Sequence, residues 1–524
     1  MLSPQDLEMP PKFRTWRPYQ AHAIESAYDA QARHCGMALP TGSGKSLIYM
    51  ALSRLVGRAV VLTSTKTLQD QLMRDFGSMG LVDVRGRANY HCLLDSEMTC
   101  DDGSDIGCHH RFSPQHVAPS CPYALALKRA QNSRLVVTNY SYWVLQNEYG
   151  EGLGSFDLLV LDEAHAAMDE LCNALRIEIT ALEVYRLLRT RLPAPEDSVS
   201  AWRSFARVFL PISEAKVEEL KQEIASGGEE DVREYRRWKR LKGKLSRLAS
   251  VEQPGQWVVE PGSQRHAIVP LWPAPFTKDH LFMDIPHVVL VSATLTKKTM
   301  ALLGIPPKDS LFSSYPSVFK PSRYPLIHVP TVRVNYRWSP DDEAQWIAQI
   351  DRIIAGRRDR KGILHSVSYE RASRIAELSQ WSGLMLLHDA KGAATAVQEF
   401  KASVDPLALV SPSVSTGHDF PGRECEYQVL VKVPWPDCRT PLMAARVEED
   451  PSYRSHIMCQ ALVQSCGRGM RAEDDRCENF VVDDYIRLVL GSCRDLLPGW
   501  FRRLYRRVEE IPAAPERLPE DLAG

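Results

Sequence analysis

The chain has 524 residues, 44% of them apolar, and its 64 lysines and arginines are balanced by 65 acidic residues to a formal charge of −1. This length suggests two to four domains with sizeable cores. The balanced charge excludes a global basic field that would gather nucleic acid over the whole surface. No run of about 18 apolar residues predicts a membrane span, and the polar, acidic N-terminus is unlike a secretory signal. We therefore expect no membrane partner and a cytoplasmic protein, prokaryotic or phage-encoded, or one that is otherwise intracellular.

A glycine-rich loop is the first motif along the chain. It reads Leu39-Pro40-Thr41-Gly42-Ser43-Gly44-Lys45-Ser46 and lies between an apolar strand and a helical run over 47–56. Glycines let backbone N–H groups wrap around phosphate oxygens, and the helix N-terminus adds positive potential. In such a loop Lys45 reaches the β- and γ-phosphates of ATP, and Ser46 holds Mg²⁺. The alternative is a glycine-rich turn that binds nothing.

Buried strands alternate with helices along the chain. Such apolar runs are typical of parallel strands covered on both faces, so they predict doubly wound α/β sheets. The first group of strands is expected at 59–63, 134–138, 158–161 and 288–291. The second group is expected at 362–366, 408–410, 427–431 and 480–482. Two segments interrupt the first group: a Cys-, His- and Asp-rich one over 85–130 and a mostly helical one over 169–280.

Four of the twelve cysteines gather in the first of these segments. They are Cys92, Cys100, Cys108 and Cys121. Four thiolates suit a [4Fe–4S] cluster or a structural zinc ion equally well, although the paired Cys-x-x-Cys knuckles typical of zinc are absent. The other alternative is four reduced thiols without a ligand, which a polar segment with no apolar core of its own does not favour.

Two adjacent carboxylates end the buried strand at 158–161. In Phe156-Asp-Leu-Leu-Val-Leu-Asp-Glu-Ala-His165, Asp162 can hold Mg²⁺ and Glu163 can orient and deprotonate an attacking water. Adjacent acids after a strand can also be a plain helix N-cap. The glycine-rich loop about 120 residues upstream favours the catalytic interpretation.

The helical segment carries a basic tract. Between Arg233 and Arg247 there are eight lysines and arginines and one acid, with Tyr235 and Trp238 among them. Such a stretch can line a phosphate path and stack bases, or it can be the solvated face of a helix. The sequence leaves both interpretations open.

The order of motifs resembles that of a known family. Asp162-Glu-Ala-His165 makes the chain similar to the DEAH-type helicases of superfamily 2. The matching elements that accompany it are Arg17-Pro-Tyr-Gln20, 63–71, Val291-Ser-Ala-Thr-Leu295, 415–422 and Gln464-Ser-Cys-Gly-Arg-Gly-Met-Arg471. The cysteines before the DEAH element, the run 135–140 after them and the long helical segment narrow the resemblance to the XPD/DinG family of iron–sulfur helicases.

The resemblance implies a role for each matched residue. Arg17 and Gln20 read adenine, and Gly417 and Asp419 belong to the nucleotide site of the second half. His165 couples hydrolysis to the rest of the motor. Gln464, Arg468 and Arg471 lie across a cleft from the phosphates, where a guanidinium neutralises charge that develops on the γ-phosphate. The residues expected to contact a nucleic-acid strand are Thr65, Lys66, Tyr140, Ser366 and Thr416.

The sequence thus predicts two RecA-like parallel-sheet domains, the first interrupted by an iron–sulfur insertion and a helical arch. The expected boundaries are 1–84, 131–168 and 281–298 for the first domain, 85–130 and 169–280 for its insertions, 299–510 for the second domain and 511–524 for a flexible tail. The expected function is an ATP-dependent helicase that works as a monomer on single-stranded and forked DNA, with 5′-to-3′ movement implied by the family. Its expected cofactors are ATP, Mg²⁺ and a [4Fe–4S] cluster, with zinc as the alternative at the same cysteines. A nucleic-acid clamp or remodeller that does not separate strands is the alternative function, and no room for an added nuclease is found.

Overall fold

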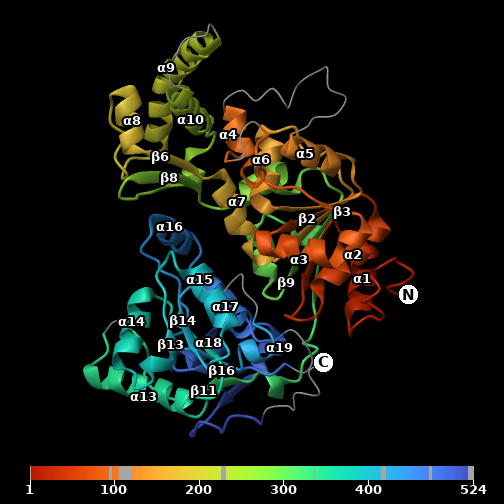
Figure 1. Ribbon diagram of the computed structural model, residues 1–524, viewed down its shortest axis with the longest axis vertical. Helices are drawn as coiled ribbons and strands as arrows, with labels where there is room; N and C mark the ends of the chain where they lie inside the picture. The colour runs from red at the N-terminus through yellow and green to blue at the C-terminus, as the bar shows by residue number, and fades with distance from the viewer. Residues whose placement is uncertain are drawn as a thin grey trace.

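The computed structural model describes residues 2–93, 97–105, 121–225, 232–335, 337–414, 420–470 and 475–516. Figure 1 shows two α/β domains, one above the other, and a helical subdomain over residues 177–270 that extends from the first. Among the described residues, no helix is long and apolar enough to cross a bilayer.

The first α/β domain is built on a seven-stranded parallel sheet in the order β10-β1-β9-β5-β2-β4-β3. Its central strands are buried along their whole length because helices pack on both faces. The strands are β1 (His34–Ala38), β2 (Ala59–Thr63), β3 (Leu81–Asp83), β4 (Leu135–Asn139), β5 (Leu158–Asp162), β9 (His287–Ser292) and β10 (Ser310–Ser314). The helices are α1 (Gln20–Tyr28), α2 (Lys45–Val56), α3 (Lys66–Phe76), α4 (Cys100–Asp105), α5 (Pro122–Asn132), α6 (Tyr140–Tyr149), α7 (Ala167–Leu175), α11 (Ala274–Phe276) and α12 (Lys297–Leu302).

The second α/β domain also has a seven-stranded parallel sheet, in the order β13-β14-β12-β15-β16-β11-β17. Its strands are β11 (Leu326–His328), β12 (Gly362–His365), β13 (Met385–Leu386), β14 (Ala408–Ser411), β15 (Tyr427–Leu430), β16 (Glu478–Val481) and β17 (Tyr505–Arg507). Its helices are α13 (Pro340–Ala355), α14 (Tyr369–Leu378), α15 (Ala393–Ala402), α16 (Pro441–Glu449), α17 (Ser452–Cys466), α18 (Tyr485–Ser492) and α19 (Gly499–Arg502). The start of α13 shows why helices begin where they do: Ser339 and Asp342 form a reciprocal capping box, and Pro340 occupies the first turn.

The helical subdomain lies between β5 and β9 in the chain and has a core of its own. Two long helices, α9 (Val199–Ala225) and α10 (Val232–Ala249), pack along each other, and α8 (Ala181–Leu188) lies beside them. At their base a small antiparallel sheet has the order β6-β8-β7, formed by β6 (Ile177–Thr180), β7 (Trp257–Glu260) and β8 (Arg265–Pro270). On α10, Trp238, Leu241 and Leu245 are buried in this core, while Arg237, Lys239 and Arg240 of the basic tract are exposed.

Three expected boundaries are wrong. The first domain does not end at residue 298, because β10 pairs in parallel with β1 along its whole length. The helical segment does not begin at residue 169, because Met168 and Leu171 of α7 belong to the core of the first domain. Residues 511–516 are not a loose tail: Ile511 packs against the second domain, and the carbonyl of Pro512 accepts a hydrogen bond from Arg357.

A buried ion pair fixes the second sheet to the end of α13. Arg357 is fully buried and donates from Nε to Glu478 Oε2 at 2.7 Å and from a terminal nitrogen to Oε1 at 2.8 Å. Its guanidinium also lies over the ring of Phe480, 4.5 Å from the centroid. The two parallel hydrogen bonds offset the free-energy cost of removing both charged groups from water.

Replacement of Arg357 by Met is expected to lower the free energy of unfolding of the second domain by about 3–5 kcal/mol, because Glu478 stays buried without its partner. Chemical denaturation followed by circular dichroism measures the loss. The matched control is Arg358→Met, since Arg358 is exposed and its removal should cost less than about 1 kcal/mol. Equal stability of the two variants would contradict a structural role for the pair.

Candidate active site

The glycine-rich loop joins β1 to α2 at the edge of the first sheet. Gly42 and Gly44 both have left-handed backbones, with φ of 75° and 74°, which glycine adopts at no steric cost. A Cβ at Gly44 would come 2.3 Å from Gln20 Nε2, so the close approach also requires glycine. The loop therefore lies at the N-terminus of α2, a position that suits the phosphate binding expected of it.

The two residues expected to read adenine lie directly against this loop. Gln20 Nε2 donates to the carbonyls of Ser43 at 2.9 Å and Gly44 at 3.3 Å. Arg17 donates to the carbonyl of Gly42 at 2.6 Å. Both side chains brace the phosphate loop in this structure.

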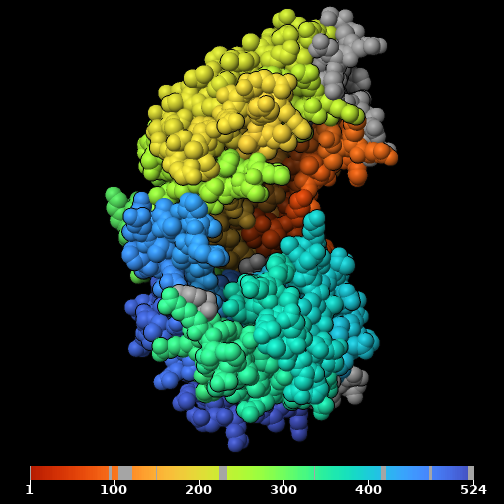
Figure 2. Space-filling view, turned by 90° about the vertical axis from the view of Figure 1, so that its left-hand side faces the viewer, coloured from red at the N-terminus to blue at the C-terminus, as the bar shows by residue number. Residues whose placement is uncertain are grey.

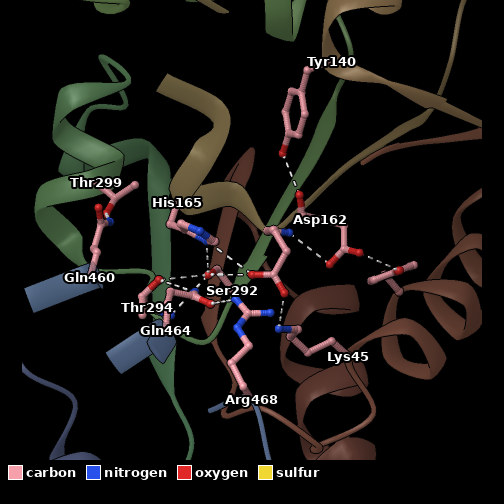
Figure 3. Close-up of polar contacts among 12 residues, drawn as sticks. Lys45, Tyr140, Asp162, His165, Ser292, Thr294, Thr299, Gln460, Gln464 and Arg468 are labelled. Atoms are coloured by element: carbon pink, nitrogen blue, oxygen red, sulfur yellow. Dashed lines mark hydrogen bonds and ion pairs between the residues drawn. The ribbon is translucent and has the colours of Figure 1, made fainter. Parts of the chain in front are cut away.

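Asp162 is the last residue of β5 and lies beside the start of α2 (Figure 3), and Glu163 follows it in the chain. Lys45 Nζ forms an ion pair with Glu163 Oε1 at 2.6 Å. Asp162 Oδ2 accepts a hydrogen bond from Tyr49 at 3.2 Å, and its Oδ1 accepts one from the Glu163 N–H at 3.0 Å. Glu163 has a left-handed backbone with φ of 49°, which is strained for a residue with a Cβ and turns its side chain toward Lys45.

The two carboxylates have different electrostatic surroundings. Burial and the charge of Glu163 raise the pKa of Asp162 to about 6. Burial also opposes ionisation of Glu163, but Lys45 and His165 outweigh it and hold the pKa of Glu163 well below its usual range. Glu163 is thus ionised at neutral pH, and Asp162 is a carboxylate that a cation would stabilise.

A chain of hydrogen bonds leads from Glu163 into the second domain (Figure 3). Ser292, at the end of β9, donates to Glu163 Oε2 at 3.3 Å and lies 2.8 Å from His165 Nδ1. The hydroxyl of Thr294 is 3.4 Å from that of Ser292. Gln464 of α17 donates to Thr294 Oγ1 at 3.1 Å and crosses from one domain to the other.

Arg468 completes this chain. Its guanidinium donates to Gln464 Oε1 at 3.1 Å, and only 8% of the residue is exposed. Burial lowers the pKa of Arg468, an effect that the negative charge of Glu163 opposes. The neighbouring Gly467 is so close to the phosphate loop that a Cβ there would lie 2.8 Å from Thr41 Oγ1. The two domains therefore meet at the candidate nucleotide site.

Several predicted site residues lie outside the described part of the chain: Arg471, Gly417, Asp419, Thr416 and Cys108. Ser292 and Thr294 were predicted only as part of the motif at 291–295 and not as members of the site. The motif itself could have identified them, since it lies at the end of a buried strand in the same sheet as the strand that carries Asp162.

Two of the residues expected to touch a nucleic-acid strand do not face a surface. Tyr140 is fully buried, and its hydroxyl donates to the carbonyl of Asp162 at 2.9 Å. Ser366 is also fully buried, and its N–H donates to Ser411. In this structure Tyr140 supports the strand that carries the acids, so the expected contacts of both residues are corrected.

Thr65 and Lys66 are accessible, whereas Thr416 lies outside the described residues. Thr65 caps α3 by accepting from the N–H of Leu68 at 3.2 Å, and Lys66 is exposed. Lys66 lines a groove of about 550 Å³ together with Arg87, Tyr123 and Asn139. The two cations can contact phosphates, but Asp101 and Glu170 also line the groove, and Tyr123 is buried.

The described cysteines of the 85–130 segment are all buried, namely Cys92, Cys100 and Cys121. The Sγ atoms of Cys100 and Cys121 are 3.7 Å apart. Burial, with smaller contributions from Cys121 and Cys92, raises the pKa of Cys100 to about 11. Within the described ranges, no three His, Cys, Asp or Glu side chains are grouped to hold a metal ion.

Comparisons with known proteins agree with this arrangement. A family model described as the res subunit of type III restriction enzymes matches residues 14–189, and one described as a helicase C-terminal domain matches residues 360–503. The ATP-dependent DNA helicase YoaA of Escherichia coli (strain K12) is 23% identical over 565 residues, covering 84% of this chain and 87% of its own. A solved XPD helicase has a TM-score of 0.62 at 15% identity, covering 94% of this chain and 99% of its own. Xpd4 of S. tokodaii has a TM-score of 0.60 at 15% identity, covering 94% and 100%.

The solved structures establish the fold of the two α/β domains as that of RecA-like motor domains. The first matched model spans the phosphate loop and Asp162–His165, and the second spans Gln464 and Arg468. These are the residues that meet between the two domains. The chain accordingly resembles the XPD/DinG-like helicases of superfamily 2, which are enzymes that hydrolyse ATP.

Proposed function

We propose that this protein is a DNA helicase that uses ATP to move along one strand, 5′ to 3′, and to separate forked duplexes as a monomer. The observation that carries the proposal is the hydrogen-bonded chain from Glu163 through Ser292, Thr294 and Gln464 to Arg468. It links the candidate catalytic carboxylate to the opposite domain, so hydrolysis and the relative position of the domains depend on each other.

The proposed mechanism assigns a task to each side chain of the site. Lys45 exchanges Glu163 for the β- and γ-phosphates when ATP enters, and this frees the Glu163 carboxylate to orient a water and take its proton. Arg468 moves toward the γ-phosphate, with Arg471 as the second candidate arginine. Ser46 and Asp162 hold Mg²⁺, which neutralises phosphate charge when it is bound. His165 is linked to Glu163 through the hydroxyl of Ser292, so its hydrogen bonding changes when Glu163 pairs with the water and no longer with Lys45.

Strand binding is proposed for the groove that Lys66 and Arg87 line and for the adjoining Thr65, and the family resemblance adds Thr416 as a further contact residue. Lysines and arginines contact phosphates without regard to sequence. Such binding weakens as salt concentration rises, because phosphate contacts release condensed counterions.

The cysteine segment is proposed to hold a thiolate-bound centre, a [4Fe–4S] cluster by resemblance, on Cys92, Cys100, Cys108 and Cys121. The three described thiols are all buried, and the Sγ atoms of Cys100 and Cys121 lie near each other. The 3.7 Å between Cys100 and Cys121 is near the edge of a tetrahedron of thiolates around one zinc at about 2.3 Å. A cluster spreads its thiolates over four irons, so these two side chains would lie further apart when it is bound.

Unwinding of tailed duplexes tests the function. The wild type should displace a strand from a 5′-tailed duplex and leave a 3′-tailed one intact. Lys45→Ala should lose strand-stimulated ATP hydrolysis by about 100-fold or more, because the cation on the phosphates is gone. Lys12→Ala, which removes an exposed lysine paired with Asp75, is the control. Stimulated hydrolysis without strand displacement supports a clamp or remodeller, and full turnover by Lys45→Ala refutes the nucleotide site.

Metal analysis tests the cysteine centre. Protein purified without oxygen should contain about four irons and four sulfides per chain. Cys100→Ser should lower both, whereas Cys493→Ser, at a buried position of the second domain, should retain them. A result of one zinc per chain without iron would show that the cysteines hold zinc and not a cluster.

A further inference from the structure

Helix α16 connects the second α/β domain to the helical subdomain. Figure 1 shows it directly below the small sheet of that subdomain, and in Figure 2 it reaches the subdomain from below on the left, beside a hollow floored by the first domain. Leu442 packs against Cys172, Ala267 and Val269. The second domain thus touches the helical subdomain and α7 of the first domain at one place.

Arg446 lies at the centre of this contact with 2% of its surface exposed. Its Nε donates to the carbonyl of Leu271, next to β8, at 2.8 Å. One terminal nitrogen donates to Asp169 Oδ1 at 3.2 Å and to the Tyr453 hydroxyl at 3.1 Å, and the other lies 3.5 Å from Cys172 Sγ. One guanidinium therefore joins the helical subdomain, the first domain and the second domain.

The helices that Arg446 contacts both lead to the nucleotide site. Asp169 and Cys172 are on α7, which begins immediately after the turn that carries His165. Tyr453 is in the first turn of α17, whose last turn carries Gln464. Because helices are stiff, a shift at the site moves the ends that Arg446 holds together.

Two further hydrogen bonds hold the same contact from outside. Glu260 Oε1 of β7 accepts from the N–H of Leu442 at 2.8 Å. Trp272 Nε1 donates to Glu449 Oε2 at 2.6 Å, and the Trp272 ring packs edge-on against Tyr453 with centroids 5.1 Å apart. Glu449 is exposed, so it can be replaced without opening a core.

We propose that Arg446 is a positioning residue that transmits nucleotide-driven movement of the two α/β domains to the helical subdomain, so that strand separation depends on it and ATP hydrolysis does not. This inference rests on the proposed helicase function. The hydrogen bonds of Arg446 go to Leu271, Asp169, Tyr453 and Cys172, which are not members of the hydrogen-bonded chain at the site, so its loss should leave that chain intact.

The test compares ATP consumed with base pairs separated by the full-length protein. Arg446→Gln should keep strand-stimulated hydrolysis within about twofold of the wild type and lower the unwinding rate about tenfold, so that ATP used per base pair rises about tenfold. Glu449→Ala, which removes the Trp272 bond, should raise that ratio about threefold. Arg439→Gln is the matched control, since Arg439 precedes the same helix with a side chain that is 90% exposed.

Thermal melting separates coupling from stability, because a purely structural role would lower hydrolysis and unwinding in parallel with the melting temperature. A ratio equal to that of the wild type in both variants overturns the proposal. If Arg446→Gln does not fold, Glu449→Ala combined with Glu260→Ala carries the same expectation and can overturn it in the same way. Absence of unwinding by the wild type would instead refute the helicase function.

Discussion

The ion pair between Lys45 and Glu163 is the interaction on which the rest of the site depends. Two carboxylates next to each other in the chain are buried at the end of β5, and their repulsion is tolerable only because each has a different partner. Glu163 takes the lysine of the phosphate loop, and Asp162 is left with a tyrosine hydroxyl and a backbone N–H. A nucleotide that draws Lys45 away must therefore change the surroundings of both acids at once.

Ser292 extends that change beyond the first domain. Its hydroxyl lies between Glu163 and His165 and is followed by Thr294, Gln464 and Arg468, so the state of one carboxylate is connected to a helix of the second domain. The opposite end of α17 meets α7 at Arg446. The site and the α16 contact thus lie at opposite ends of α17 and are both joined to α7, which is how local chemistry can become movement of whole domains.

The parts predicted from sequence are those that local chemistry determines. The buried strands β2 and β5 are continuous apolar runs. The phosphate loop and the two acids are recognisable because few other kinds of site use these residue types in this order. The parts that were missed depend on long-range pairing. The polar sequence of β10 does not show that this strand pairs with β1. The docking of residues 511–516 likewise involves Arg357, which is far away in sequence.

Burial explains the two wrong contact residues as well. A tyrosine and a serine after strand ends look like candidates for a nucleic-acid strand, but sequence does not show whether such a side chain turns outward. Tyr140 turns inward because the carbonyl of Asp162 offers it an acceptor in the core. The same inward turn connects α6 to the acids and makes Tyr140 part of the support of the site.

A double-mutant cycle between Thr294→Val and Gln464→Leu tests the link between the domains most directly. Each change removes one partner of the same 3.1 Å hydrogen bond, so each should reduce strand-stimulated ATP turnover, and the double variant should be no slower than the slower single variant within about twofold. If the losses multiply instead, the two residues act independently, and the connection from Glu163 to the second domain does not run through this bond.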